Sequence, residues 1–184
     1  MQKTKPRLME RYEKVAAPQA MEKFGLKNTM AVPKFKKVVI NVGLKQGIKD
    51  PKFIDHAEKI LSKISGQKPV KTLAKKSISN FKIRQGMVVG MMVTLRGRRM
   101  YDFLDKLVNV TLPRVRDFRG LSPKTIDHHG NMTIGFKEFI AFPEVRPDDT
   151  DYVHGLEITI VTNAKSKDQG LTLLRGIGFP INEK

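Results

Sequence analysis

The segment from Lys59 to Tyr101 carries eleven basic residues and not one Asp or Glu. These 43 residues supply +11 of the chain's net charge of +17. A segment without acids cannot neutralise its own positive field, so its side chains must stay in water or face a polyanion. The segment also contains alternating apolar residues and glycines, which lysines kept for solubility alone would not require. Whatever fold the chain adopts must therefore leave a large basic surface uncovered.

Nucleic acid is the polyanion that such a surface binds most often, because each neutralised phosphate releases condensed counterions. We therefore expect the chain to bind a nucleic acid through this segment. A solvated, lysine-rich face is the alternative interpretation of the same charge. A free DNA-binding module is a further alternative, although the sequence has no helix-turn-helix or zinc signature.

The composition indicates a globular protein. The chain has 184 residues, of which 40% are hydrophobic, and we expect a single domain over residues 1–184. The absence of Cys excludes disulfides and thiolate metal sites. The first residues are too polar for a secretory signal, and the longest apolar run, Met87 to Val93, is too short to cross a bilayer. We expect a cytoplasmic protein with no membrane partner.

Apolar periodicity predicts the elements of the first third of the chain. Helical spacing favours a helix over residues 6–25, kinked or restarted at Pro18 and ending at a glycine. Alternation predicts a strand over residues 38–44. Asp50 and the following proline are typical of a helix start and predict a helix that continues to Gly66.

The basic segment itself predicts a loop and two strands. Residues 66–79 are polar and lack helical period, which indicates a long loop or a hairpin tip. A short strand over residues 81–84 is predicted to turn at Gln85-Gly86 into a strand over residues 87–95. Gly90 within that last strand indicates a bulge or a close approach of another backbone.

The remaining third alternates between periodic and irregular stretches. We expect a third helix after Gly97, irregular chain over residues 113–127 and a strand over residues 131–142. An acidic, proline-containing loop over residues 143–152 precedes a last strand. Ser166 and Gln169 form a capping-box pair that opens the final helix.

The two strands joined near Gln85-Gly86 are too close in sequence for a crossover connection, which favours antiparallel pairing. We therefore predict an α+β fold with a largely antiparallel sheet and helices packed on one face. The other face would then be free for a ligand, as would a long basic loop within residues 66–79. Polar and basic side chains along the strands suit contact with a sugar-phosphate backbone: Lys37, Asn41, Lys82, Arg84, Thr94 and Arg96.

No group of residues predicts catalysis, a metal site or a cofactor. His128 and His129 follow Asp127, but adjacent residues on a strand point in opposite directions and no zinc-binding spacing supports them. The acids at positions 148, 149 and 151 lie in a solvated loop without a ligand pattern. There is no phosphate-binding glycine loop. We expect neither an enzyme nor a small-molecule substrate, with an RNA-processing or RNA-modifying enzyme kept as the alternative.

At five segments the chain resembles the bacterial large-subunit ribosomal protein five, the family that binds 5S ribosomal RNA. The resembling segments occur in the family's order and span nearly the whole chain: PKFKKVVINVGL from Pro33, GQKPVKTLAKKSISNFKIRQG from Gly66, VTLRGRRMYDFLDKL from Val93, LPRVRDFRGLS from Leu112 and LEITIVTNA from Leu156.

The resemblance implies that the sheet docks on 5S RNA in the central protuberance, beside other components of that region. Carried over by motif, the residues that face this RNA would be Lys37, Asn41, Gln67, Phe81, Arg84, Thr94 and Arg96. Phe81 would either stack on a splayed base or pack inward. Asn, Gln and Thr side chains among lysines agree with an RNA recognised by its shape and its 2′-hydroxyls.

The resemblance also implies two further partners. The protruding loop, residues 71–80, would reach transfer RNA in the peptidyl site through Lys71, Thr72, Lys75, Lys76 and Ser77. A protein of the small-subunit head would contact Val110–Arg116 and the loop over residues 143–152, forming a bridge between the subunits.

Overall fold

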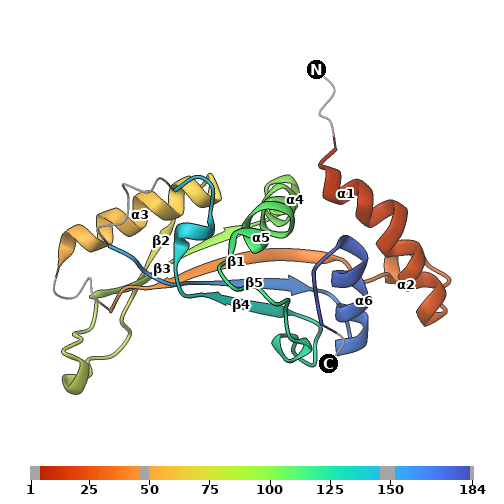
Figure 1. Cartoon of the computed structure of the whole chain (residues 1–184). Coiled ribbons are helices and arrows are strands. Elements are labelled where there is room, and N and C mark those ends of the chain that lie inside the picture. The colour runs from red at the N-terminus through yellow and green to blue at the C-terminus, as the bar shows by residue number, and fades with distance from the viewer. Residues whose placement is uncertain (1–4, 46–49, 146–151, 183–184) are drawn as a thin grey trace. The chain divides into compact units, whose positions relative to one another are not determined.

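A computed structural model describes residues 5–45, 50–145 and 152–182. Five strands form one antiparallel sheet in the order β2-β3-β1-β5-β4. They are β1 (Phe35–Gly43), β2 (Val70–Leu73), β3 (Val88–Leu95), β4 (Met132–Phe136) and β5 (Leu156–Thr162). The predicted α+β class with an antiparallel sheet is confirmed (Figure 1).

The chain divides into two compact units. The first comprises Met1–Val38, Leu95–Ile134 and Thr159–Lys184, and the second comprises Val39–Thr94 and Gly135–Ile158. Each unit therefore gathers segments that are far apart in the sequence. The expectation of a single domain over the whole chain stays a prediction.

In the first unit, the N-terminal helix is continuous but changes its winding. Helix α1 (Arg7–Arg11) runs into a π-helical stretch, Tyr12–Ala16, and then into α2 (Ala17–Phe24). Pro18 stands in the first turn of α2, where its missing N–H is tolerated. The winding changes just before this proline, which accounts for the predicted kink or restart. The helix ends as predicted at Gly25, which has a left-handed φ of 61°.

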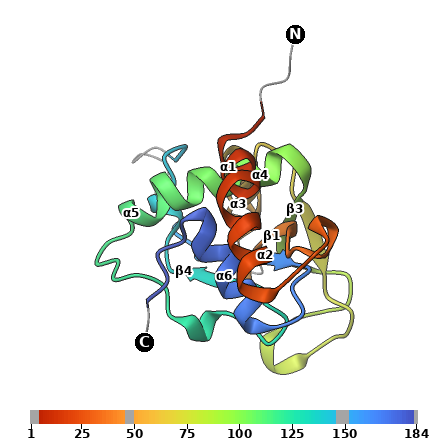
Figure 2. The same ribbon diagram turned by 90° about the vertical axis from the view of Figure 1, so that its right-hand side faces the viewer.

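Two other helices of this unit, which begin at Gly97 and Lys167, pack on the N-terminal helix (Figure 2). Helix α4 (Gly97–Lys106) continues through a π-helical stretch, Leu107–Thr111, into α5 (Leu112–Arg114). Helix α6 (Lys167–Ile177) begins where expected, since the Ser166 hydroxyl accepts a hydrogen bond from the backbone N–H of Gln169. The predicted helices are thus confirmed.

The strand predicted over residues 131–142 is wrong beyond β4. The chain leaves the sheet after Phe136 and forms a 3-10 turn over Phe139–Ala141. Phe139 and Phe142 are both completely buried, and burial at a spacing of three residues suits a turn rather than a pleated strand. Apolar content alone could not distinguish these two conformations.

In the second unit, helix α3 (Pro51–Ser65) covers one face of the strands (Figure 1). Its N-terminus is capped as predicted, because the Asp50 carboxylate accepts a hydrogen bond of 2.9 Å from the backbone N–H of Lys52. Gly66 ends the helix with a φ of 65°. The apolar stripe of the helix is buried: Phe53, Ala57, Ile60, Leu61 and Ile64.

Among the residues described, no helix combines the length and the apolar content that crossing a bilayer requires.

Candidate nucleic-acid interface

The second unit leaves one face of its strands open to solvent. In β1, Ile40 and Val42 are buried, whereas Asn41 between them is exposed. In β3, Met91 and Val93 are buried, whereas Met92 is exposed. The side chains on this open face are uncharged: Val39, Asn41, Val70, Thr72, Met92 and Thr94. Met92 and Val70 were not among the predicted interface residues, and Val70 could not be, because β2 was not predicted.

A backbone oxygen of β1 and a side-chain oxygen of β2 lie close to β3 at Gly90. A Cβ atom at this position would lie 2.9 Å from the carbonyl oxygen of Val42 and 2.9 Å from Oγ1 of Thr72. The pairing of β2 with β3 also shifts register between Thr72 and Leu73, opposite Gly90 and Val88. Both interpretations of Gly90, a bulge and a close approach, are therefore confirmed. Glycine fits at this point because a side chain would collide with both neighbouring strands.

Residues 74–87 form a hairpin extension of β2 and β3 that we call the finger (Figure 1). At its base, the backbone N–H of Ala74 donates to the carbonyl of Met87 at 2.8 Å. Farther out, Ile78 and Ile83 exchange two backbone hydrogen bonds of 2.9 and 3.1 Å. Between these levels, the Ser77 hydroxyl accepts a bond of 3.0 Å from the N–H of Gln85.

The finger corrects two expectations of the sequence analysis. Residues 81–84 are not a strand: Ser79–Phe81 form a 3-10 turn at the tip, and Lys82 follows with a left-handed φ of 55°. The turn at Gln85-Gly86 exists, with the N–H of Met87 bonded to the carbonyl of Arg84 at 3.1 Å, but it bends one arm of the hairpin. The strand that pairs with β3 is instead β2, within the stretch interpreted as a loop or hairpin tip.

The cations of the finger have no acidic partner among the described residues. Lys75, Lys76, Lys82 and Arg84 are exposed, and no Asp or Glu among the described residues forms an ion pair with them. Phe81 is 61% exposed, so the alternative that it packs inward is wrong. An exposed ring among four cations suits a single strand or loop of RNA, in which bases can stack and phosphates are close.

Strand alternation separates two residues that sequence analysis placed together in the protruding loop. Lys71 and Thr72 both lie in β2. Thr72 is paired with Gly90 and belongs to the open face, whereas Lys71 is paired with buried Met91 and belongs to the face that α3 covers. The protruding element therefore does not begin at residue 71, as predicted. It is the finger, residues 74–87, which includes both arms of the hairpin.

Glu58 of α3 holds Lys71 on the covered face. The Nζ atom of Lys71 lies 2.9 Å from one carboxylate oxygen of Glu58, and Nζ of Lys68 lies 4.0 Å from the other. The hydrogen bond from Lys71 is the main cause that lowers the pKa of Glu58, and it raises the pKa of Lys71 in turn. The positive charges of Lys71 in β2 and of Lys68 in the turn before it are thus partly neutralised.

Two further predicted residues belong to the first unit. Lys37 is half-buried in β1, and Arg96 is exposed immediately before α4, where its side chain makes no capping hydrogen bond. Their positions relative to the residues of the second unit are not described. Gln67 and Thr94, by contrast, are brought together within the second unit, with Nε2 of Gln67 3.4 Å from the carbonyl oxygen of Thr94.

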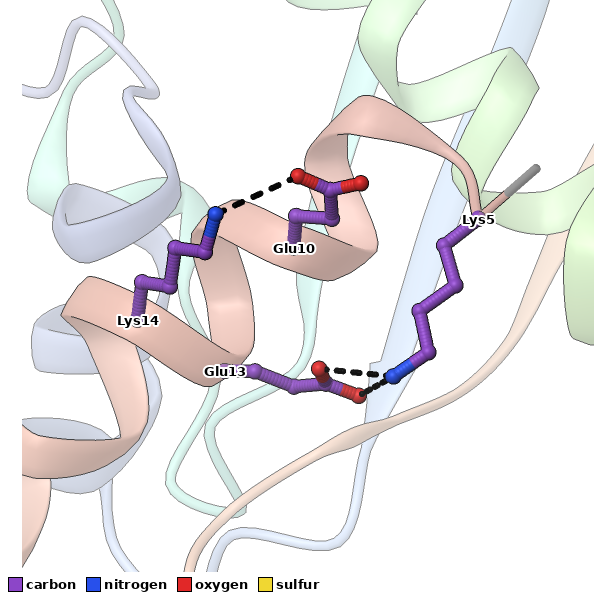
Figure 3. A network of polar contacts seen from close by, with 4 residues as sticks. All are labelled: Lys5, Glu10, Glu13 and Lys14. Atoms are coloured by element: carbon purple, nitrogen blue, oxygen red, sulfur yellow. Dashed lines mark hydrogen bonds and ion pairs between the residues drawn. The ribbon is translucent and has the colours of Figure 1, made fainter.

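The charges of the N-terminal helix are arranged differently from those of the finger. Lys5 bonds both carboxylate oxygens of Glu13, at 3.0 and 3.2 Å, and Lys14 lies 3.4 Å from Glu10 (Figure 3). These lysines are neutralised by neighbours on the same segment, so they offer little attraction to a polyanion. Net charge alone would not distinguish them from the lysines of the finger.

The histidines next to Asp127 form a turn with no catalytic geometry. The Asp127 carboxylate accepts hydrogen bonds from the backbone N–H groups of His129 and Asn131 and from the Asn131 side chain. Partial burial opposes ionisation, but these bonds lower the pKa of Asp127 on balance. Both histidine side chains are exposed. Within the described ranges, no three His, Asp or Glu side chains gather in a way that could hold a metal ion.

The segments expected to contact a small-subunit protein are only partly described. Val110 is 39% exposed at the end of α4's π-helical continuation, and Arg114 and Arg116 are exposed. Residues 146–151, with the acids at 148, 149 and 151, lie outside the described residues.

Comparison with known proteins gives matches over almost the whole chain. A family model described as ribosomal protein L5 matches residues 28–84, and one that describes the C-terminus of the same ribosomal family matches residues 88–181. The large ribosomal subunit protein uL5 of Halothermothrix orenii is 54% identical over 176 residues, which cover 96% of this chain and 98% of that protein.

Two other relatives match to a similar extent. The uL5 proteins of Carboxydothermus hydrogenoformans and Desulforapulum autotrophicum are 51% and 54% identical to this chain. The matches cover 96% and 94% of this chain, and 99% and 97% of the relatives.

Proposed function

Because the chain belongs to the ribosomal protein L5 family, whose members are structural, non-enzymatic constituents of the large subunit of the cytoplasmic ribosome, we propose that it binds 5S ribosomal RNA. The family excludes the alternative of an RNA-processing enzyme. In this proposal the protein helps to attach 5S RNA within the central protuberance, beside other proteins and RNA of that region.

One observation supports this proposal above all others: the second unit has an uncharged, open sheet face next to a basic finger. The amide and hydroxyl groups of Asn41, Thr72 and Thr94 can bond ribose 2′-hydroxyls and phosphate oxygens, which are the groups that an RNA helix displays in its shallow groove. Gln67 stands at the edge of this face. Arg84, in the finger, and Arg96 would add phosphate contacts.

We further propose that the finger contacts transfer RNA in the peptidyl site. Its lysines at positions 75 and 76 have no acidic partner among the described residues, and its backbone hydrogen bonds hold them on an extension of the sheet. An element of this kind can reach a second RNA while the sheet face holds the first. A small-subunit head protein would contact Val110–Arg116, as the family resemblance implies.

Direct binding of 5S RNA by the pure protein tests the proposal. About five to eight phosphate contacts predict that log affinity falls with log salt at a slope of about −4 to −7. A structured RNA of the same length and unrelated sequence serves as the control and should bind more weakly. Equal binding of the two RNAs, or affinity that does not change with salt, would contradict the proposal.

A further inference from the structure

Glu58 pairs with two lysines on the side of the second unit that lies opposite the open face. Within the second unit, α3 covers the face opposite the open one, and β2 is the edge strand of the sheet. Lys71 projects from this edge on the covered side, and Lys68 lies in the turn just before the strand. Two lysines at an open edge would attract RNA to a side that cannot hold it in register.

The geometry of the carboxylate suits this role. Each of its two oxygens faces a different ammonium group, at 2.9 Å for Lys71 and 4.0 Å for Lys68. The Glu58 side chain is only 23% exposed, whereas Lys68 is 86% exposed. The carboxylate is thus held at the surface of α3. Without it, the side chains of the two lysines could move freely. Position 58 also directly precedes the acid-free segment, so the carboxylate stands at its border.

We propose that Glu58 is a specificity-determining residue that confines RNA binding to the open face. Its carboxylate occupies Lys68 and Lys71 and so competes with phosphate for them. Specificity is a difference between two affinities, and it rises when binding to the wrong RNA or the wrong side is weakened. This inference rests on the proposed binding of 5S RNA to the open face, because only then do the two lysines lie outside the cognate interface.

The test compares Glu58→Gln with the native protein on 5S RNA and on polyuridine of the same length. Freeing two lysines should raise the affinity for polyuridine about three- to tenfold and steepen the salt slope by about one to two. The affinity for 5S RNA should change by less than twofold. Lys71→Met added to Glu58→Gln should reverse most of the gain.

Asp102→Asn is the matched control, because Asp102 pairs with Arg98 at 3.7 Å and its loss changes the net charge equally. This variant should change neither affinity by more than twofold. Equal gains for both RNAs in Glu58→Gln would overturn the inference, since the lysines would then face the cognate RNA. Unchanged polyuridine binding would overturn it as well. Failure of the proposed function is a different result: the native protein would not prefer 5S RNA over polyuridine.

Discussion

The side-chain amide of Gln67 reaches the backbone carbonyl of Thr94 across 3.4 Å, although 27 positions separate the two residues. Gln67 follows the end of α3, and Thr94 lies near the end of β3. The contact fixes the turn after the helix against the strand that carries part of the open face. Since Nε2 donates to the sheet, we expect the amide oxygen of Gln67 to be the atom that accepts a hydrogen bond from an RNA hydroxyl. Two residues that are predicted to contact RNA are therefore held together at the edge of the open face.

Asn41 provides a direct test of the open face. Its side chain is exposed between two buried residues of β1, so its removal should hardly affect folding. We expect Asn41→Ala to lower 5S RNA affinity by about 1–3 kcal/mol, because an RNA group is left without its partner. The free energy of unfolding should change by less than about 0.5 kcal/mol. Binding isotherms and urea denaturation measure the two effects; a loss of stability with unchanged affinity would make Asn41 structural.

Charge reversal in the finger separates its role from that of the sheet. Lys75→Glu with Lys76→Glu should leave 5S RNA binding by the free protein within about threefold, roughly 0.7 kcal/mol. The same change should speed dissociation of transfer RNA from the peptidyl site of reconstituted ribosomes, since repulsion replaces attraction to phosphate. Lys27→Glu, a change at an exposed lysine of the first unit, is the control and should leave transfer RNA release normal. A collapse of 5S binding would mean that the finger anchors the first RNA.

Gly90 and Gly43 form a matched pair for the packing of the open face. A methyl group at position 90 meets a backbone oxygen at 2.9 Å, whereas no atom of the described residues lies within 4 Å of one at position 43. Gly90→Ala should therefore reduce the free energy of unfolding by about 1–3 kcal/mol through overpacking. Gly43→Ala should be nearly neutral. Thermal unfolding of both variants decides the matter, and equal melting temperatures would show that β3 can move away from its neighbours.

Stability should fall at mildly acidic pH because of His154. This ring is 6% exposed and packs against Phe139 at 4.6 Å. Burial is the main cause that lowers the pKa of His154, and the nearby His56 adds to it. The unfolded chain takes up the proton near pH 6.5, before the folded one does. The contribution of neutral His154 to the free energy of unfolding is thus complete above that pH. It is lost as the pH falls towards the folded pKa, by about 1.4 kcal/mol per pH unit.

Urea denaturation at pH 7.5 and 5.5 measures this loss. His154→Leu should flatten the dependence on pH, whereas the exposed pair His128→Ala with His129→Ala should leave it as in the native protein. If the His154 variant keeps the native dependence, another group is responsible.

Local sequence patterns determined the features that depend on near neighbours. Helix ends were predicted because Asp50, Gly25, Gly66 and Ser166 act on backbone groups within a few residues of themselves. The α+β class followed from the period of the apolar residues. Antiparallel pairing was predicted from a strand over residues 81–84 that does not form, and β2 takes its place beside β3. The basic segment could be located because its composition, eleven cations and no acid, does not depend on the fold.

Tertiary structure alone decided which of these residues share a surface. The sequence could not place Lys71 and Thr72 on opposite sides, because their assignment depends on the pairing of β2 with β3. It could not predict that Glu58 would neutralise Lys68 and Lys71, since their contact joins a helix to a separate strand. Whether the ring of Phe81 is exposed or packs inward likewise depended on whether its neighbours formed a strand or the tip of the finger. The pairing of elements that are far apart in the sequence is set by the packing of the whole unit, which no local pattern can predict.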